Sequence, residues 1–151
     1  MVKFLEFLTK GPSQTKKIGE ILAKDILKTE FQKTAFVMGL EGELGSGKTT
    51  FLQGFAKGLK IKEKILSPTF TIIKKFPIFN SQFSNFFHID CYRLKKEKEL
   101  LALGFKEIIS DPRNIVAIEW ADKAKKTLPK KVILLKFKFL NKNIRKITIT
   151  I

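Results

Sequence analysis

The chain has 151 residues, of which 44% are hydrophobic, and carries a formal net charge of +16. This length predicts a single domain over residues 1–151, and one cysteine excludes an internal disulfide and a cysteine metal cluster. No apolar run reaches the length of a membrane span, and Glu6 and Lys10 interrupt the first residues where a signal peptide would need a long apolar stretch. We therefore expect a cytoplasmic protein with no membrane partner.

The positive charge has two interpretations. A strongly basic surface attracts nucleic acid by neutralising its phosphates. However, nearly all the basic residues are lysines, with arginine only at Arg93, Arg113 and Arg145, and the chain is rich in Ile, Phe and Asn. An AT-rich genome produces this bias without selection for any ligand. Charge alone leaves attraction to RNA and compositional drift as equal alternatives, and direct reading of bases is not expected.

The N-terminal part of the chain predicts a strand, a helix and a second strand. Residues 1–8 have the apolar content of a short strand. A turn follows at 11–13, where Ser13 is a candidate N-cap for a helix that runs to about Thr29. The apolar stripe of this helix consists of Ile18, Ile21, Leu22 and Ile26. Residues 35–40 then predict a short buried strand.

A phosphate-binding loop follows this second strand. Residues 42–49 are GELGSGKT and match G-x-x-x-x-G-K-[ST] at every fixed position. The glycines let backbone N–H groups surround phosphate oxygens, Lys48 supplies a cation for the β- and γ-phosphates, and the Thr49 hydroxyl can ligate Mg²⁺. A helix over 48–57 directs its N-terminus at the anion. The alternative, an accidental match in a glycine-rich turn, is disfavoured by this strand and helix, so we expect ATP or GTP binding.

The middle of the chain predicts a strand, a loop, a strand and a helix. The strands are expected over 69–76 and 86–90, and the loop between them, at 77–85, has the composition of a hairpin connection. A charged, amphipathic helix is expected over 95–103 and ends near Gly104.

The last third of the chain returns to strands. A turn at 111–114 leads into a continuous apolar strand at 115–118, of the kind buried on both faces. A basic helical turn is expected at 123–126, and strands over 132–140 and 144–151 form a hairpin at the C-terminal edge. The whole order predicts an α/β fold with a mostly parallel central sheet, antiparallel additions and flanking helices.

Two acidic residues at strand ends are candidates to act with the loop. Phosphate-loop enzymes need a carboxylate near Mg²⁺, usually at the carboxyl end of a neighbouring buried strand. Glu119 follows the apolar run at 115–118, and Asp90 follows the run at 86–89. We expect Glu119 to hold the metal and Asp90 to hold the metal or the attacking water. For each residue the alternative is an ordinary strand-end acid that caps a turn.

Four neighbouring residues have two interpretations each. His88, the only histidine, is favoured as a positioned structural donor over a general base. Arg93 either stabilises charge or pairs with a nearby acid. Trp120 is either a packed aromatic or an exposed contact for a partner. Cys91 is expected to be buried and not nucleophilic, because no catalytic partner is evident.

Four sequence blocks taken together resemble the TsaE (YjeE) family. They are GELGSGKTT at 42–50, SPTFT at 67–71, HIDCYRL at 88–94 and Glu119-Trp120. The first block alone is generic, whereas the four in this order and spacing are specific, and the likeness spans nearly the whole chain. The resemblance implies a single-domain P-loop NTPase fold and a weak Mg²⁺-dependent ATPase.

The resemblance also implies a role. Members of this family are bacterial ATPases required for threonylcarbamoyladenosine formation in tRNA. They work with TsaB and TsaD, where TsaD modifies the adenosine beside the anticodon and the ATPase supports repeated turnover. The protein would then meet tRNA through this complex, with direct contact left open.

The motif match assigns site residues to this chain. The ATP-binding residues would be Thr15, near the adenine, together with Glu43, Leu44, Gly45, Ser46, Gly47, Lys48, Thr49 and Thr50. The Mg²⁺ residues would be Thr49, Asp90 and Glu119, and the catalytic residues Lys48, Asp90 and Glu119. Residues 67–71 would form a switch-like segment near the γ-phosphate.

Two other classes of protein are alternatives. A small-molecule kinase shares the loop but normally adds an arginine-rich lid, and the three scattered arginines here indicate neither a lid nor an arginine finger near the loop. A nucleotide-gated RNA-binding module would use the basic surface as its function, and a steep salt dependence of tRNA affinity would identify it. Both rank below the ATPase accessory protein.

Overall fold

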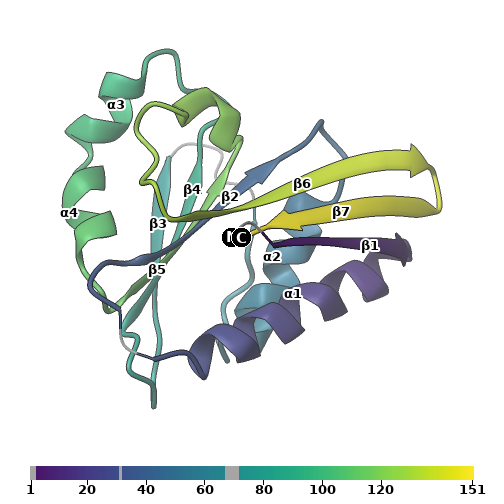
Figure 1. Cartoon of the computed structure of the whole chain (residues 1–151), viewed down its shortest axis with the longest axis horizontal. Coiled ribbons are helices and arrows are strands. Elements are labelled where there is room, and N and C mark those ends of the chain that lie inside the picture. Colours follow the sequence, from purple (N-terminus) through teal and green to yellow (C-terminus); the bar gives the residue numbers. More distant parts are fainter. Residues whose placement is uncertain (1–2, 31, 67–71) are drawn as a thin grey trace.

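The computed structural model describes residues 3–30, 32–66 and 72–151, which form a seven-stranded sheet with helices on both faces (Figure 1). The strands are β1 (Phe4–Lys10), β2 (Phe36–Glu41), β3 (Ile73–Pro77), β4 (Asn85–Asp90), β5 (Asn114–Glu119), β6 (Val132–Asn141) and β7 (Ile144–Thr150). The helices are α1 (Gly11–Leu27), α2 (Lys48–Gly58), α3 (Glu97–Ala102), α4 (Phe105–Ser110) and the 3₁₀ helix η1 (Ala121–Ala124).

The sheet is parallel at its centre and antiparallel at both sides. Its strand order is β1-β7-β6-β2-β5-β4-β3, in which β6, β2, β5 and β4 are mutually parallel. The hairpin of β3 and β4 and the strands β7 and β1 are antiparallel to their neighbours. This confirms the predicted α/β sheet. The C-terminal hairpin is present but does not form the edge, because β1 pairs with β7 outside it.

The two faces of the central strands contact different helices. Met38 on β2 belongs to the apolar cluster under α1 and α2, whereas Val37 belongs to the cluster under α3, α4 and η1. Figure 1 shows the corresponding helices on opposite sides of the sheet. The strand β5 is buried along its whole length, as its apolar run predicted. The carboxyl ends of the parallel strands are therefore held in a rigid, doubly covered layer.

Helices α1 and α2 approach each other through glycines. A Cβ atom on Gly54 would lie 1.9 Å from the Lys16 carbonyl oxygen, and one on Gly19 would lie 2.2 Å from the Phe51 carbonyl oxygen. Neither position has room for a side chain, so the two helix backbones are in direct contact. This contact places Thr15 of α1 beside the loop that precedes α2, where its methyl group is 3.7 Å from the Cβ position of Gly47.

The first helix differs from its prediction at both ends. It begins at Gly11, so its N-cap is Lys10 and not Ser13, and it ends at Leu27. Ile21, expected in the apolar stripe, is exposed. The buried positions are mostly small, namely Thr15, Gly19, Ala23 and Ile26. A hydropathy pattern does not identify this face, because close helix packing selects for size more than for hydrophobicity here.

Other predicted elements moved or divided. The helix expected over 95–103 is the shorter α3, and Gly104, at φ 85°, connects it to α4, which was not predicted. The helical turn expected at 123–126 is η1, two residues earlier. The strand expected over 69–76 is β3, and residues 69–71 lie outside the described residues. The strands predicted at 86–90, 132–140 and 144–151 are confirmed as β4, β6 and β7.

Candidate functional site

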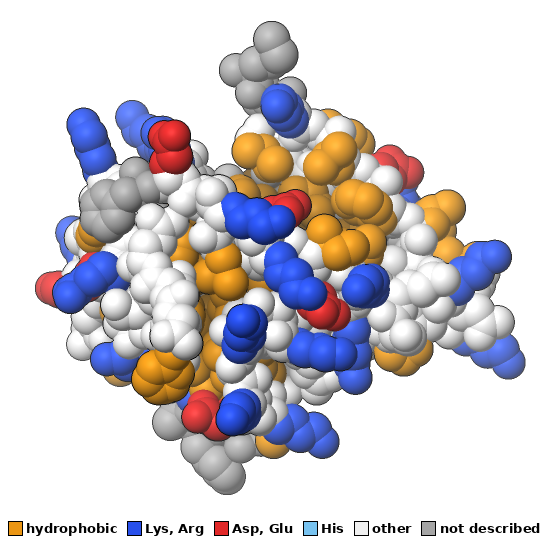
Figure 2. Space-filling model, turned by 90° about the horizontal axis from the view of Figure 1, so that it is seen from below, with side chains coloured by type: hydrophobic (Ala, Val, Ile, Leu, Met, Phe, Trp, Pro, Cys, Tyr) orange, Lys and Arg blue, Asp and Glu red, His pale blue; other side chains and the backbone are white. Residues whose placement is uncertain are grey.

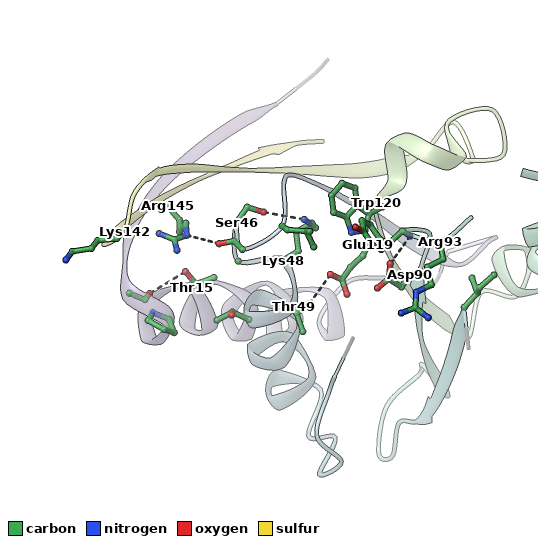
Figure 3. Close-up of a pocket in the computed structure, with 18 residues that line it drawn as sticks. Thr15, Ser46, Lys48, Thr49, Asp90, Arg93, Glu119, Trp120, Lys142 and Arg145 are labelled. Atoms are coloured by element: carbon green, nitrogen blue, oxygen red, sulfur yellow. Dashed lines mark hydrogen bonds between the residues drawn. The ribbon is translucent and has the colours of Figure 1, made fainter. Parts of the chain in front are cut away.

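A pocket of about 660 Å³ opens at the carboxyl ends of β2, β4 and β5, a volume typical of small-molecule sites (Figure 3). Ten of the eleven residues assigned by motif line it, namely Thr15, Leu44, Gly45, Ser46, Gly47, Lys48, Thr49, Thr50, Asp90 and Glu119. The exception is Glu43, whose side chain is exposed and borders a second cavity beside β6. The backbone carbonyl of Glu43 does enter the site, as an acceptor for Lys48.

The loop between β2 and α2 depends on its glycines at two points. Gly47, the N-cap of α2, has φ 107°, a conformation that side chains rarely adopt. A Cβ atom on Gly42 would lie 2.6 Å from the carbonyl oxygen of Phe137 on β6. The loop therefore lies against β6 and turns sharply into the helix, so the N-terminus of α2 faces the pocket and favours an anion there.

The Lys48 ammonium is held inside this loop. It donates hydrogen bonds to the carbonyl oxygens of Gly42 and Glu43, the second at 2.9 Å, and its Nζ lies 4.3 Å from the centre of the Trp120 ring. Lys48 is only 5% exposed. Burial lowers its pKa, an effect that the carboxylates of Glu119 and Asp90 partly oppose. The cation lies at the pocket wall, where it would attract an anionic ligand.

Glu119 connects the loop helix to the sheet. Its Oε1 accepts a 3.0 Å hydrogen bond from the Thr49 hydroxyl, and its Oε2 lies 2.6 Å from Nε2 of His88. Glu119 is 2% exposed, at the end of β5, and it lies opposite Asp90 in the parallel register of β4 and β5. The structure thus brings Thr49, Asp90 and Glu119 to one side of the pocket, as the motifs predicted.

Asp90 has an environment that disfavours its charge. Burial raises the pKa of its carboxyl group, the hydrogen bond from the Tyr92 backbone N–H lowers it, and the nearby charge of Glu119 raises it again. A cation between the two carboxylates would remove this repulsion. Within the described residues, no group of three His, Cys, Asp or Glu side chains could hold a metal alone. Oxygen ligands from two acids and a hydroxyl suit Mg²⁺, which normally takes its remaining ligands from phosphate and water.

The four residues with two interpretations each differ in whether they line the pocket. His88 is fully buried beneath Glu119 and does not line the pocket, whereas Arg93 does. Trp120 is half-buried, packs against Tyr92 with ring centres 5.0 Å apart, and lines the pocket. Cys91 is buried, and burial raises the pKa of its thiol to about 12, as expected for a residue that is not a nucleophile. Residues 67–71, the predicted switch-like segment, lie outside the described residues.

Sequence reasoning missed the far wall of the pocket. Lys142 and Arg145, from the β6–β7 hairpin, line it at the end where Thr15 lies, across from Asp90 and Glu119 (Figure 3). The Arg145 guanidinium donates from Nε to the Gly45 carbonyl oxygen at 3.3 Å and stacks over Phe139 at 4.4 Å. Two of the three arginines thus reach the pocket, although they are scattered in sequence. The sequence predicted the hairpin but not the element that the hairpin would contact, so it could not place Lys142 and Arg145 at the pocket.

Comparison with known proteins agrees with this geometry. The family model described as "Threonylcarbamoyl adenosine biosynthesis protein TsaE" matches residues 9–147. The chain belongs to the TsaE family. This confirms the resemblance drawn from the four sequence blocks, three of which meet in the described part of the pocket.

Individual relatives match over most of their length. A Bacillus subtilis protein named tRNA threonylcarbamoyladenosine biosynthesis protein TsaE is 37% identical over 149 residues, covering 99% of this chain and 87% of that protein. A Haemophilus influenzae protein of the same name is 34% identical over 118 residues, covering 78% and 72%. The crystal structure of Bacillus subtilis YdiB is 34% identical with a TM-score of 0.75, covering 99% of this chain and 86% of that one. The family membership and the likeness to this crystal structure together show that the chain has a P-loop NTPase fold.

The structure also bears on membrane association. Among the described residues, no helix combines the length and the apolar character needed to cross a bilayer.

Proposed function

We propose that this chain binds ATP with Mg²⁺, hydrolyses it slowly, and serves as an accessory ATPase in threonylcarbamoyladenosine synthesis on tRNA. It would act in the cytoplasm with TsaB and TsaD, on the adenosine beside the anticodon. Membership of the TsaE family supports the pathway, since relatives that match most of this chain bear the name of that biosynthesis.

The observation that carries the nucleotide proposal is the Thr49–Glu119 contact. A hydroxyl from the loop helix and a buried carboxylate from β5 meet at 3.0 Å beside the Lys48 cation. This combination of a loop, a hydroxyl and a strand-end acid suits a phosphate chain with its metal. An acid that only caps a turn at a strand end is normally exposed to solvent, whereas Glu119 is 2% exposed and bonded to Thr49 of the phosphate loop.

Each residue has a chemical task in this proposal. The loop N–H groups and Lys48 bind the phosphate oxygens and stabilise the negative charge that develops during transfer. Thr49 and Glu119 would hold Mg²⁺, which when bound supplies Lewis-acid stabilisation to those oxygens. Asp90, less buried than Glu119, faces the pocket and would accept a hydrogen bond from the attacking water or assist the metal. Asp90→Asn separates these roles: loss of binding indicates the metal, and loss of turnover alone indicates the water.

The charge of the surface bears on direct contact with tRNA. The chain carries 30 Lys and Arg residues against 14 Asp and Glu. On the face shown in Figure 2, basic side chains form a band across the surface and acidic ones are few. Such a surface suits an RNA backbone held near the protein by its partners, without reading bases.

Phosphate release from ATP tests the proposal, measured for the chain alone and with a purified TsaB–TsaD pair. We expect slow release alone, a clear increase with the pair, and none above background for Lys48→Ala. An unchanged rate with the pair, together with no complex on size-exclusion chromatography, would contradict the accessory role. Release that depends on an added phosphate acceptor would instead indicate a kinase.

A further inference from the structure

The sole histidine of the chain lies behind the candidate site and not in it. His88 is fully buried on β4, two residues before Asp90, and its side chain does not line the pocket. Its Nε2 lies 2.6 Å from Oε2 of Glu119, which comes from the adjacent strand β5. Because the ring is fully buried and does not line the pocket, it cannot contact substrate, and we expect any effect on the reaction to pass through Glu119.

Each oxygen of the Glu119 carboxylate has one hydrogen-bond partner. Thr49 from α2 bonds Oε1 at 3.0 Å, and His88 from β4 bonds Oε2. Two donors on two different elements fix both the position and the rotation of a carboxylate, which one donor alone would leave free to turn. Glu119 is 2% exposed, so water cannot readily replace either donor.

The second ring nitrogen of His88 indicates which proton is present. Nδ1 is buried and has no hydrogen-bond partner among the described residues. An ionised carboxylate only accepts, so towards an ionised Glu119 the ring donates from Nε2, and in the neutral ring Nδ1 then carries no proton. The packing therefore favours a single tautomer with its N–H directed at Glu119.

We propose that His88 is a positioning residue that orients the Glu119 carboxylate toward Thr49 and the metal side of the pocket. This inference rests on the proposed function, since it concerns the same carboxylate. It assigns His88 no proton transfer to substrate. Histidine or carboxylate partners behind metal-site residues typically affect metal affinity or activity by about 10- to 100-fold.

The test compares two substitutions at one position. His88→Leu fills the space without a donor, and His88→Gln restores an amide N–H directed along the side chain. Affinity for ATP is measured with Mg²⁺ and with EDTA, and phosphate release gives KM and kcat. We expect His88→Leu to lose about 10- to 100-fold of the Mg²⁺-dependent gain and of kcat, with ATP affinity in EDTA changed less than about threefold. His88→Gln should recover most of this loss.

A matched control lies at the other end of the same two strands. Asn114 on β5 is buried and accepts a 3.1 Å hydrogen bond from the Asn85 side chain on β4. Asn114→Ala should lower thermal stability but leave the Mg²⁺ dependence intact. If it alters the Mg²⁺ dependence as His88→Leu does, the effect at His88 is general loosening of the strands and the positioning role is overturned. Equal defects in folded His88→Gln and His88→Leu would overturn it as well.

A second measurement needs neither nucleotide nor turnover. Because there is one histidine, ¹⁵N-labelling of histidine gives one imidazole in the NMR spectrum. We expect a proton on Nε2 in the folded protein, and a changed ring signal in Glu119→Gln. Protonation at Nδ1 with a bare Nε2 would overturn the inference. Absence of Mg²⁺-dependent ATP binding in the unaltered protein would instead contradict the proposed function, while this spectrum would still report the contact.

Discussion

Thr49 and Glu119, 70 positions apart in sequence, share a 3.0 Å hydrogen bond that links the first turn of α2 to the end of β5. The bond brings the hydroxyl of the phosphate loop onto the one acid of the site that is almost fully buried. Since Glu119 is also bonded to His88, the loop is connected through one carboxylate to two neighbouring strands of the central sheet. A change at Thr49 should therefore affect the metal side of the pocket more than the phosphate side.

Thr49→Val tests this relation, because valine keeps the shape and removes the hydroxyl. We expect ATP binding in EDTA to change little and the gain on adding Mg²⁺ to fall at least about tenfold, which equals 1.4 kcal/mol. Isothermal titration calorimetry with and without Mg²⁺ measures both quantities. Thr49→Ser is the matched control, since it retains the hydroxyl. If Thr49→Val kept the full Mg²⁺ gain, the Thr49–Glu119 bond would be structural only.

Trp120 offers an intrinsic signal for ligand binding. It is the only tryptophan, its ring lies at the pocket wall, and Lys48 Nζ is 4.3 Å from its centre. Phosphate binding should draw the Lys48 ammonium away from this ring and from the loop carbonyls, which changes the polarity around the indole. We therefore expect ATP to change the fluorescence intensity or the emission maximum. Lys48→Met should lack this response, and an equal response in that variant would show that ATP acts on Trp120 from elsewhere.

Gly54→Ala tests the contact between α1 and α2. The new methyl group would be 1.9 Å from the Lys16 carbonyl oxygen, and backbone cannot move aside as a flexible side chain can. We expect a net loss of roughly 1–3 kcal/mol in the free energy of unfolding, because overpacking exceeds the higher helix propensity of alanine. Thermal unfolding followed by circular dichroism measures it. Lys57→Ala introduces the same side chain at an exposed position of α2 and should change stability by less than about 0.5 kcal/mol.

The sequence was sufficient for those parts of the site that local chemistry determines. The loop at 42–49 and the acids Asp90 and Glu119 were predicted because each follows a short apolar strand. The carboxyl ends of parallel strands share one edge of a sheet, so these residues had to meet. The C-terminal hairpin was predicted for the same local reason, from two β-rich runs around a short polar turn.

The parts that the sequence did not predict depend on contacts between distant elements. Arg145 reaches the pocket because the β6–β7 hairpin lies beside the phosphate loop, where its Nε donates to the Gly45 carbonyl oxygen. No local sequence pattern indicates this contact or the pairing of β7 with β1. The buried face of α1 consists largely of Thr15, Gly19 and Ala23, which close helix packing favours and hydropathy overlooks. Ser13 has the residue type of an N-cap, but the actual N-cap is Lys10, three residues earlier, and the chain enters the helix directly from β1.

Cys91 is predicted to be an unreactive thiol in the folded protein. It is fully buried between Asp90 and Tyr92, and burial raises its pKa from 9.0 to about 12, with Asp90 and Asp122 adding to the shift. The thiolate is the reactive form, so at pH 8.5 alkylation by iodoacetamide should be at least about 100-fold slower in the folded chain than in guanidinium chloride.

The pH dependence of this reaction should also differ between the two states. A raised thiol pKa means that ionisation is delayed, so the rate in the folded chain should keep rising with pH past 9, while the rate in the unfolded chain levels off near its ordinary pKa. Mass spectrometry of the single cysteine follows both, and Cys91→Ala provides the blank. A folded-state rate that levels off near pH 9 would show that the thiol at the end of β4 is accessible, which would require the strand end beside Asp90 to open in solution.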